Sequence, residues 1–220
     1  MTWDASAVAA ACEPVPGSAA SVFGAALPTA VTYAGILATR GVEQGLIGPH
    51  EVPRLWGRHL LNCAVVAELI EPRPVTLLDL GSGAGLPGLV LAMVLPGTAV
   101  TLLEPMERRC RFLAVCITEL RLANVTVLRG RAEDVTIRTD VVTARAVAPL
   151  PRLAELAMGV VRPGGMVLAI KGRTAAEELR AAGPVLRRLG ARDARVVRAG
   201  QGKVDPATTV VRFTARRGRA

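Results

Sequence analysis

Short apolar runs alternate with longer stretches of mixed polarity along most of the chain. The runs cover residues 75–80, 99–104, 125–128, 140–146 and 166–171. A short uninterrupted apolar run is typical of a strand that helices cover on both faces of a parallel sheet. The stretches between them, residues 89–95, 105–122, 150–161 and 174–189, have helical spacing of apolar positions. This alternation predicts an α/β domain with a mostly parallel sheet.

The end of the chain breaks the alternation. Two further predicted strands, residues 194–199 and 208–216, follow each other across a loop containing Gly, Lys, Asp and Pro, without a helix between them. Two strands joined by a short loop form an antiparallel hairpin. We therefore expect seven strands, the last of them antiparallel.

The first third of the chain predicts helices that pack on this domain. Helical spacing covers residues 25–39 and 51–70, with a loop over residues 41–49. Residues 1–24 are rich in Ala, Ser, Gly and Pro, which predicts an extension with some disorder. We divide the chain into this extension, a helical segment over residues 25–74 and a core domain over residues 75–220.

A glycine-rich turn follows the first predicted strand and supplies the strongest signal in the sequence. The stretch from Asp79 to Gly88 reads D-L-G-S-G-A-G-L-P-G and runs directly into a helix. Gly81, Gly83 and Gly85 leave the main chain accessible to a ligand, and a helix N-terminus favours anionic groups. A tight turn without a ligand has the same pattern, so the turn alone is a weak signal.

Acidic residues at the ends of the next two strands strengthen the ligand interpretation. Glu104 ends the second strand, where a carboxylate can accept both hydroxyls of a ribose. Ala132 and Glu133 follow the third strand and could face an adenine edge. NAD-dependent dehydrogenases and methyltransferases that use S-adenosylmethionine (SAM) share this arrangement, and the closing antiparallel pair favours a class I SAM-dependent methyltransferase, Rossmann-like in its core.

Basic residues also lie near the predicted ligand edge. Arg145 ends the fourth strand and needs a partner among apolar neighbours, either a carboxylate such as Glu133 or a substrate. Lys171 ends the fifth strand. Arg58 and His59 lie beside the apolar stripe of the 51–70 helix, where a hydrogen-bonded structural histidine is more common than a catalyst.

Arg108 and Arg109 open the helix after the second strand, either as a solvated face or near the ligand edge. Charge is unevenly distributed: residues 151–220 hold 15 Lys and Arg against 5 Asp and Glu, whereas residues 1–150 hold 12 against 13. This surplus suits a polyanionic partner, although a solvated basic surface would look the same.

The composition also sets limits. The four cysteines show no C-x-x-C spacing and there are only two histidines, so we expect no metal site and a reduced, cytoplasmic environment. We find no signal peptide and no uninterrupted apolar run of membrane-spanning length, and therefore expect no membrane partner. Without a sustained heptad pattern, we expect a monomer.

With these motifs in place, the chain resembles the bacterial small-subunit (16S) ribosomal RNA guanine-N7 methyltransferases, the glucose-inhibited division protein B (GidB) family. The resemblance rests on R-H-L-L-N from Arg58, D-L-G-S-G-A-G-L-P-G from Asp79, L-L-E with R-R-C-R-F-L, R-A-E-D, A-R-A-V-A-P-L and A-I-K-G. It covers residues 55–171. An Asn-Leu-Thr stretch common in the family is absent, and Gly45-Leu-Ile-Gly-Pro stands there instead.

The resemblance implies a SAM-dependent enzyme that methylates N7 of a guanine in 16S rRNA, alone or within the 30S particle. It places the SAM contacts on Gly81, Leu86, Ala132 with Glu133, and Arg145, with Glu104 for the ribose. Since guanine N7 carries no proton, no general base is expected, and positioning falls to Arg145 and Lys171. As RNA contacts we expect residues Arg58, His59, Arg108, Arg109 and Lys171.

Three other functions remain open at this stage. A SAM-dependent methyltransferase of a small molecule or protein is the nearest. An NAD-dependent oxidoreductase would share the glycine turn and Glu104. A SAM-binding or RNA-binding module without catalysis is the third.

Overall fold

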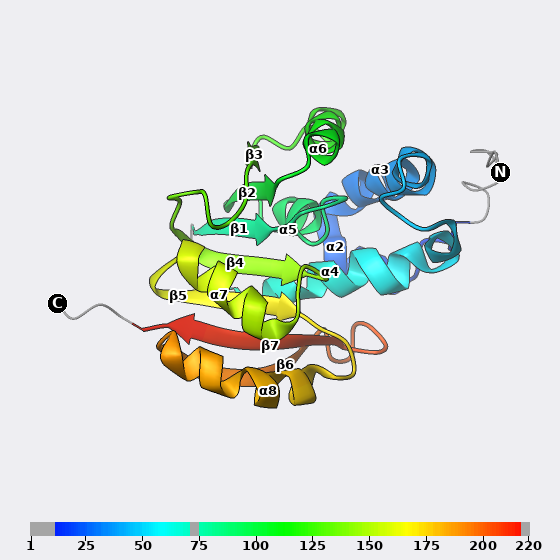
Figure 1. The fold of residues 1–220 in the computed structure, drawn as a ribbon. Coiled ribbons are helices and arrows are strands. Elements are labelled where there is room, and N and C mark those ends of the chain that lie inside the picture. Colours follow the sequence, from blue (N-terminus) through cyan, green and yellow to red (C-terminus); the bar gives the residue numbers. More distant parts are fainter. Residues whose placement is uncertain (1–11, 71–74, 217–220) are drawn as a thin grey trace.

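We describe a computed structural model of the chain that covers residues 12–70 and 75–216. Its strands form one seven-stranded sheet in the order β3-β2-β1-β4-β5-β7-β6 (Figure 1). The strands are β1 (Thr76–Leu80), β2 (Ala99–Glu104), β3 (Val125–Arg129), β4 (Thr139–Arg145), β5 (Val161–Ile170), β6 (Ala191–Ala199) and β7 (Thr208–Ala215). Residues 1–11, the first part of the extension for which we expected some disorder, lie outside the described part.

The sheet confirms the predicted fold class. β1 to β5 pair in parallel, and β7 runs antiparallel to both of its neighbours, β5 and β6. The closing hairpin therefore inserts its second strand between β5 and the edge strand β6. Ala169 pairs with Val211, so the insertion continues the buried centre of the sheet.

Helices cover both faces of the sheet, as uninterrupted apolar strands require. On one face lie α3 (Leu27–Ile36), α4 (Asn62–Ala64), α5 (Gly88–Val94) and α6 (Glu107–Glu119). On the other lie α7 (Leu150–Val160) and α8 (Ala175–Arg188). Successive strand residues alternate between the two cores: Leu77 and Leu102 pack in the first, Leu78 and Leu103 in the second.

The start of β5 differs from the sequence expectation, which began this strand at residue 166. Residues 162–165, which read R-P-G-G and lie before the expected start of the strand, belong to β5 and form a bulge. Thr139 pairs with Val161 and Val141 with Met166, so the four residues between have no register partners on β4, although Arg162 forms an ion pair with Asp140. Gly164, at φ +77°, provides the left-handed backbone that this bulge requires.

The N-terminal segment is helical over more residues than the spacing predicted. One run comprises α2 (Ser18–Phe23), η1 (Gly24–Ala26), α3 and η2 (Leu37–Gly41); the second comprises η3 (Pro49–Arg54), η4 (Trp56–Leu61), α4 and η5 (Val65–Leu69). The first begins before the expected Ala25. The second confirms a helical run near residues 51–70, although its turns vary in tightness and Pro53 lies within its first part.

The run Ser18–Gly41 is also long and apolar enough to cross a membrane by length and composition. In this fold it packs against the core. Tyr33 and Leu37 are fully buried, and Phe23 contacts Trp56 edge-to-face with ring centroids 6.0 Å apart. This run therefore packs one set of side chains on the core of the domain.

Candidate functional site

Two adjoining pockets open where the parallel strands end. The larger, of about 390 Å³, lies beyond β1, β2 and β3, and the smaller, of about 260 Å³, lies between the glycine loop, the end of β4 and the N-terminal helices. Gly81, Arg109 and Ala146 line both. Their position matches the carboxyl edge at which open α/β sheets bind ligands.

The glycine loop is shaped by close contacts. Gly81 has φ +68°, and a Cβ there would lie 2.9 Å from Cγ2 of Val147. Gly85 has φ +96°, and its Cβ would meet the side chain of Leu89 at 2.4 Å. No larger residue fits either position without movement of its surroundings, so the loop needs glycine for both dihedral and space.

Asp79 supports the loop from below. Its side chain is fully buried, and its Oδ2 accepts a 3.1 Å hydrogen bond from the N–H of Gly88 at the start of α5. Its Oδ1 accepts another from the Thr143 hydroxyl on β4 at 3.2 Å. Burial raises the pKa of Asp79 to about 6. Asp79 lines neither pocket, so a role in cofactor binding would act through the loop.

Glu104, in contrast, lines the larger pocket at the tip of β2. One carboxylate oxygen accepts the Gly83 N–H at 3.0 Å and the other accepts the Met106 N–H at 3.0 Å. Each oxygen retains capacity for a further donor. The carboxylate is therefore fixed in place and still able to accept hydroxyl groups from a ligand.

Ala132 and Glu133 also line the larger pocket, after β3. Glu133 forms an ion pair with Arg152 of α7. The alternative prediction, that Arg145 pairs with Glu133, is therefore wrong. The two residues lie on different pockets, because Arg145 turns toward the N-terminal helices.

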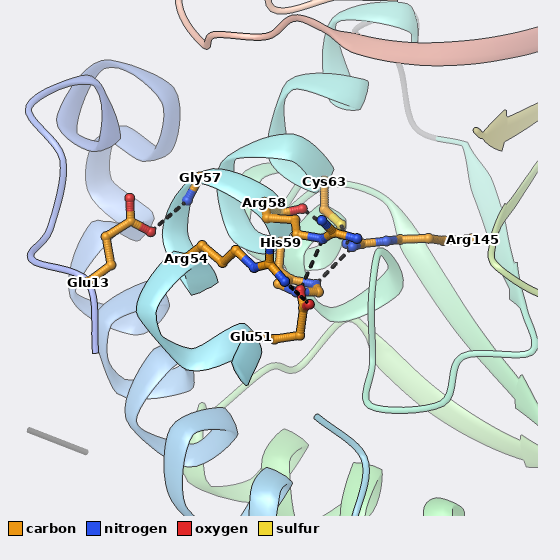
Figure 2. Close-up of polar contacts among 8 residues, drawn as sticks. All are labelled: Glu13, Glu51, Arg54, Gly57, Arg58, His59, Cys63 and Arg145. Atoms are coloured by element: carbon orange, nitrogen blue, oxygen red, sulfur yellow. Dashed lines mark hydrogen bonds and ion pairs between the residues drawn. The ribbon is translucent and has the colours of Figure 1, made fainter. Parts of the chain in front are cut away.

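Arg145 reaches from the end of β4 into a polar network on the second helical run (Figure 2). Its Nη1 donates to the sulfur of Cys63 at 3.2 Å, and its Nη2 donates to the Arg58 carbonyl at 3.3 Å and to Nδ1 of His59 at 2.8 Å. His59 in turn lies 2.8 Å from Glu51 through Nε2. Arg145 and His59 both line the smaller pocket.

The other basic candidates lie in different surroundings. Arg109 lines both pockets, with its Nη1 3.8 Å from Glu104. Arg58 pairs with Glu51 on the surface, and Arg108 is exposed. Lys171 donates to Glu178 at 2.7 Å and to the Ala148 carbonyl at 3.0 Å, and it lines neither pocket.

Sequence reasoning missed part of the pocket walls. Ala146 has φ +55°, an uncommon conformation for a residue with a Cβ, at the seam of the two pockets. Leu46 and Ile47, from the stretch that departs from the family pattern, line the smaller pocket. No sequence pattern indicated that Glu51 lies in the same network as Arg145. Tyr33, the single tyrosine, contacts the glycine loop, and the sequence analysis gave it no role.

In the described residues, no three His, Cys, Asp or Glu side chains gather where they could hold a metal ion. Cys12, Cys63, Cys110 and Cys116 are free thiols. Burial raises the pKa of the Cys63 thiol, which suits its role as a neutral acceptor.

The fold is shared with solved methyltransferases. A SAM-dependent O-methyltransferase from Thermotoga maritima superposes with a TM-score of 0.58 at 16% identity, covering 72% of this chain and 66% of that one. A SAM-dependent methyltransferase from Aquifex aeolicus gives 0.56 at 19% identity, covering 74% and 93%. At these identities the likeness establishes the class I methyltransferase fold.

Sequence comparisons are more specific. The family model described as rRNA small subunit methyltransferase G matches residues 26–205. The ribosomal RNA small subunit methyltransferase G of Thermobifida fusca is 58% identical, over 91% of this chain and 85% of the relative. That of Streptomyces avermitilis is 54% identical, over 93% and 87%. The chain therefore belongs to the rRNA small subunit methyltransferase G family of SAM-dependent enzymes.

Proposed function

We propose that the protein transfers the methyl group of SAM to N7 of a guanine in 16S rRNA. The observation that carries this proposal is the pair of adjoining pockets at the carboxyl edge, in a chain of this family. Glu104 stands in the larger pocket and Arg145 in the smaller, with Gly81 between them.

The side chains present fit SAM. Glu104 offers fixed carboxylate oxygens for a ribose diol, and Ala132 with Glu133 offers a polar edge beside it. Arg145 offers a cation for the carboxylate of the methionine end, next to the backbone of the glycine loop. We infer that Gly81 and Leu86 complete this lining. Asp79 acts beneath the loop by fixing Gly88.

When bound, SAM supplies a methyl group on a sulfonium ion. Guanine N7 has a lone pair and no proton, so the protein has to orient the base and needs no side chain to remove a proton. His59 agrees with this, because burial and the charge of Arg145 lower its pKa to about 4 and make it a weak proton acceptor. Arg145 positions groups in the smaller pocket, and Lys171 positions the segment after β5 through Glu178.

The arginines around the openings of the two pockets are the best candidates for RNA contacts. Arg58, Arg108 and Arg109 present cationic groups near the two pockets, and guanidinium groups bind phosphates and the O6 and N7 edge of guanine. His59 and Lys171 were also expected to contact RNA. Their burial and internal hydrogen bonds favour supporting roles instead.

The target guanine needs an accessible N7. In A-form RNA this atom lies in a deep, narrow major groove, so the base has to be in a loop or bulge or be flipped out. With six aromatic side chains in the chain, recognition has to rely on phosphates and shape more than on base stacking. We propose that a monomer in the cytoplasm acts on the folded 30S particle.

The test supplies radiolabelled SAM to the protein with 30S particles, and in parallel with naked 16S rRNA, both from cells that lack this enzyme. We expect label in 7-methylguanosine, with 30S the better substrate. Label on another atom would contradict the N7 assignment. Measurable SAM binding without transfer to either RNA would contradict the rRNA assignment and point to a small-molecule or protein substrate.

A further inference from the structure

The partners of Arg145 are unusual because all of them are neutral. The guanidinium donates to the Cys63 thiol, the Arg58 carbonyl and the imidazole of His59. Within residues 12–70 and 75–216, no carboxylate lies within ion-pair distance of Arg145. The hydrogen bonds thus fix the orientation of the guanidinium, while its charge stays available to an anionic ligand.

A carboxylate is present one step further away. Oε2 of Glu51 lies 2.8 Å from Nε2 of His59, and Nδ1 of the same ring lies 2.8 Å from Arg145 (Figure 2). A guanidinium has only donors and an ionised carboxylate only acceptors. The ring between them must therefore accept at Nδ1 and donate at Nε2, which fixes one neutral tautomer.

We propose that Glu51 and His59 are positioning residues that aim the Arg145 guanidinium at an anionic group in the smaller pocket. Glu51 fixes the tautomer and the ring plane of His59, and His59 fixes Arg145. Because the imidazole separates the two charges, Glu51 orients Arg145 without neutralising it. A direct Glu51–Arg145 pair would consume the charge that the ligand needs.

Burial supports this division of roles. His59 is 8% exposed, and the side chain of Glu51 is 23% exposed, so the ring has little freedom to turn away. Arg54 and Arg58 also pair with Glu51 from its solvent side, which keeps the carboxylate ionised. Burial raises the pKa of Glu51, but the hydrogen bond from His59 and the charges of Arg58 and Arg54 outweigh it and leave the pKa lowered.

This inference rests on the proposed function only for the identity of the anionic ligand. The anionic group is the SAM carboxylate if the effect appears in SAM binding without RNA. It is an RNA phosphate if the effect is confined to the KM for 30S particles. Either source uses the same guanidinium chemistry.

The experiment compares His59→Phe, Glu51→Leu, Arg145→Lys and the double variant His59→Phe/Arg145→Lys with the wild type. Glu51→Gln retains an acceptor for His59 and serves as the conservative variant. Glu119→Gln is the matched control, since it removes a carboxylate from the remote surface pair with Arg40. SAM affinity is measured by calorimetry. Values of kcat and KM are measured with 30S particles as substrate, and stability is measured by urea unfolding.

We expect His59→Phe and Glu51→Leu to weaken SAM binding, or to raise the KM for 30S, by roughly tenfold, as for loss of a hydrogen bond to a charged group. Glu51→Gln should restore most of this. In the double variant, His59→Phe should add little once Arg145 is replaced, because the two act through one interaction. Fully additive effects would overturn the proposal.

A spectroscopic readout separates positioning from general stability. The chain has two histidines, and His50 is exposed, so nitrogen-15 spectra of labelled histidine resolve His59 against an internal reference. We expect protonation at Nε2 alone in the wild type and in Glu119→Gln, and a mixture of tautomers in Glu51→Leu. An Nδ1-protonated His59 in the wild type, or unchanged SAM binding and KM in folded variants, would overturn the inference. Failure of the wild type to methylate rRNA would refute the proposed function and leave these readouts standing.

Discussion

The hydroxyl of Tyr33 donates a 2.6 Å hydrogen bond to the main-chain carbonyl of Ala84. It joins α3, from the N-terminal segment, to the centre of the glycine loop, 51 residues away. Both groups are buried, and a Cβ on Gly85 would lie 2.9 Å from the same hydroxyl. The N-terminal segment therefore contributes to the candidate site, because it holds the loop backbone in place.

Replacing Tyr33 with Phe should destabilise the protein by about 1–3 kcal/mol, because the Ala84 carbonyl loses its buried partner. SAM affinity should fall as well, since the loop gains freedom. Urea unfolding and calorimetric titration with SAM measure the two effects. Thr32→Val is the control on the same helix: its exposed hydroxyl bonds only to the Pro28 carbonyl, and we expect a change below about 0.5 kcal/mol. Equal effects of both variants would contradict the link to the loop.

Asp79 should make stability fall as pH rises from about 4 to 6. Its pKa of about 6 in the folded protein lies above the ordinary value near 3.9, so the folded state holds the proton more tightly across that window. Above pH 6 the carboxylate is ionised in both states, and the difference becomes constant. Asp79→Asn has no such titration. The stability of the wild type relative to Asp79→Asn should therefore decline by a few kcal/mol across the window. A difference that is flat with pH, or rises, would contradict the assignment.

The sequence was sufficient for the sheet because its strands are short apolar runs that only a covered sheet can bury. Ala99–Glu104 was predicted with both boundaries correct, and Glu104 was placed at the ligand edge from its position alone. Strand ends converge at one edge in any parallel sheet, so residues there can be identified from order along the chain.

The contacts of Arg145 could not be predicted in the same way. Its partners are Arg58, His59 and Cys63, which lie more than 80 residues earlier and approach Arg145 only in the folded domain. Tyr33 reaches Ala84 through a similar long-range contact. Strand periodicity specifies which face a residue occupies, whereas the packing of a helix against a loop depends on side-chain shape across the whole interface.

Gly88 should be intolerant of a side chain. A Cβ there would lie 2.3 Å from Cδ2 of Leu102 and 2.7 Å from Oδ2 of Asp79, so Gly88→Ala forces both to move. We expect a loss of about 1–3 kcal/mol by urea unfolding, with weaker SAM binding because the start of α5 shifts. Gly159→Ala in α7 is the opposite case. Nothing lies within 4 Å of its Cβ position, and it should stabilise the protein by up to about 1 kcal/mol. A neutral Gly88→Ala would show that the loop rearranges freely.

Replacing Arg109 should weaken the binding of both SAM and RNA, because this residue lines both pockets. Its guanidinium lies 3.8 Å from the Glu104 carboxylate, too far for a strong pair, and 38% of its side chain is exposed. We expect Arg109→Gln to raise the KM for 30S particles and to reduce the salt dependence of RNA binding by about one counterion. SAM affinity should fall by a smaller factor. Arg138→Gln is the control, since this exposed arginine precedes β4 at the opposite edge of the sheet. If the two variants gave equal salt slopes, the RNA-facing surface would have to lie elsewhere than at the mouth of the pockets.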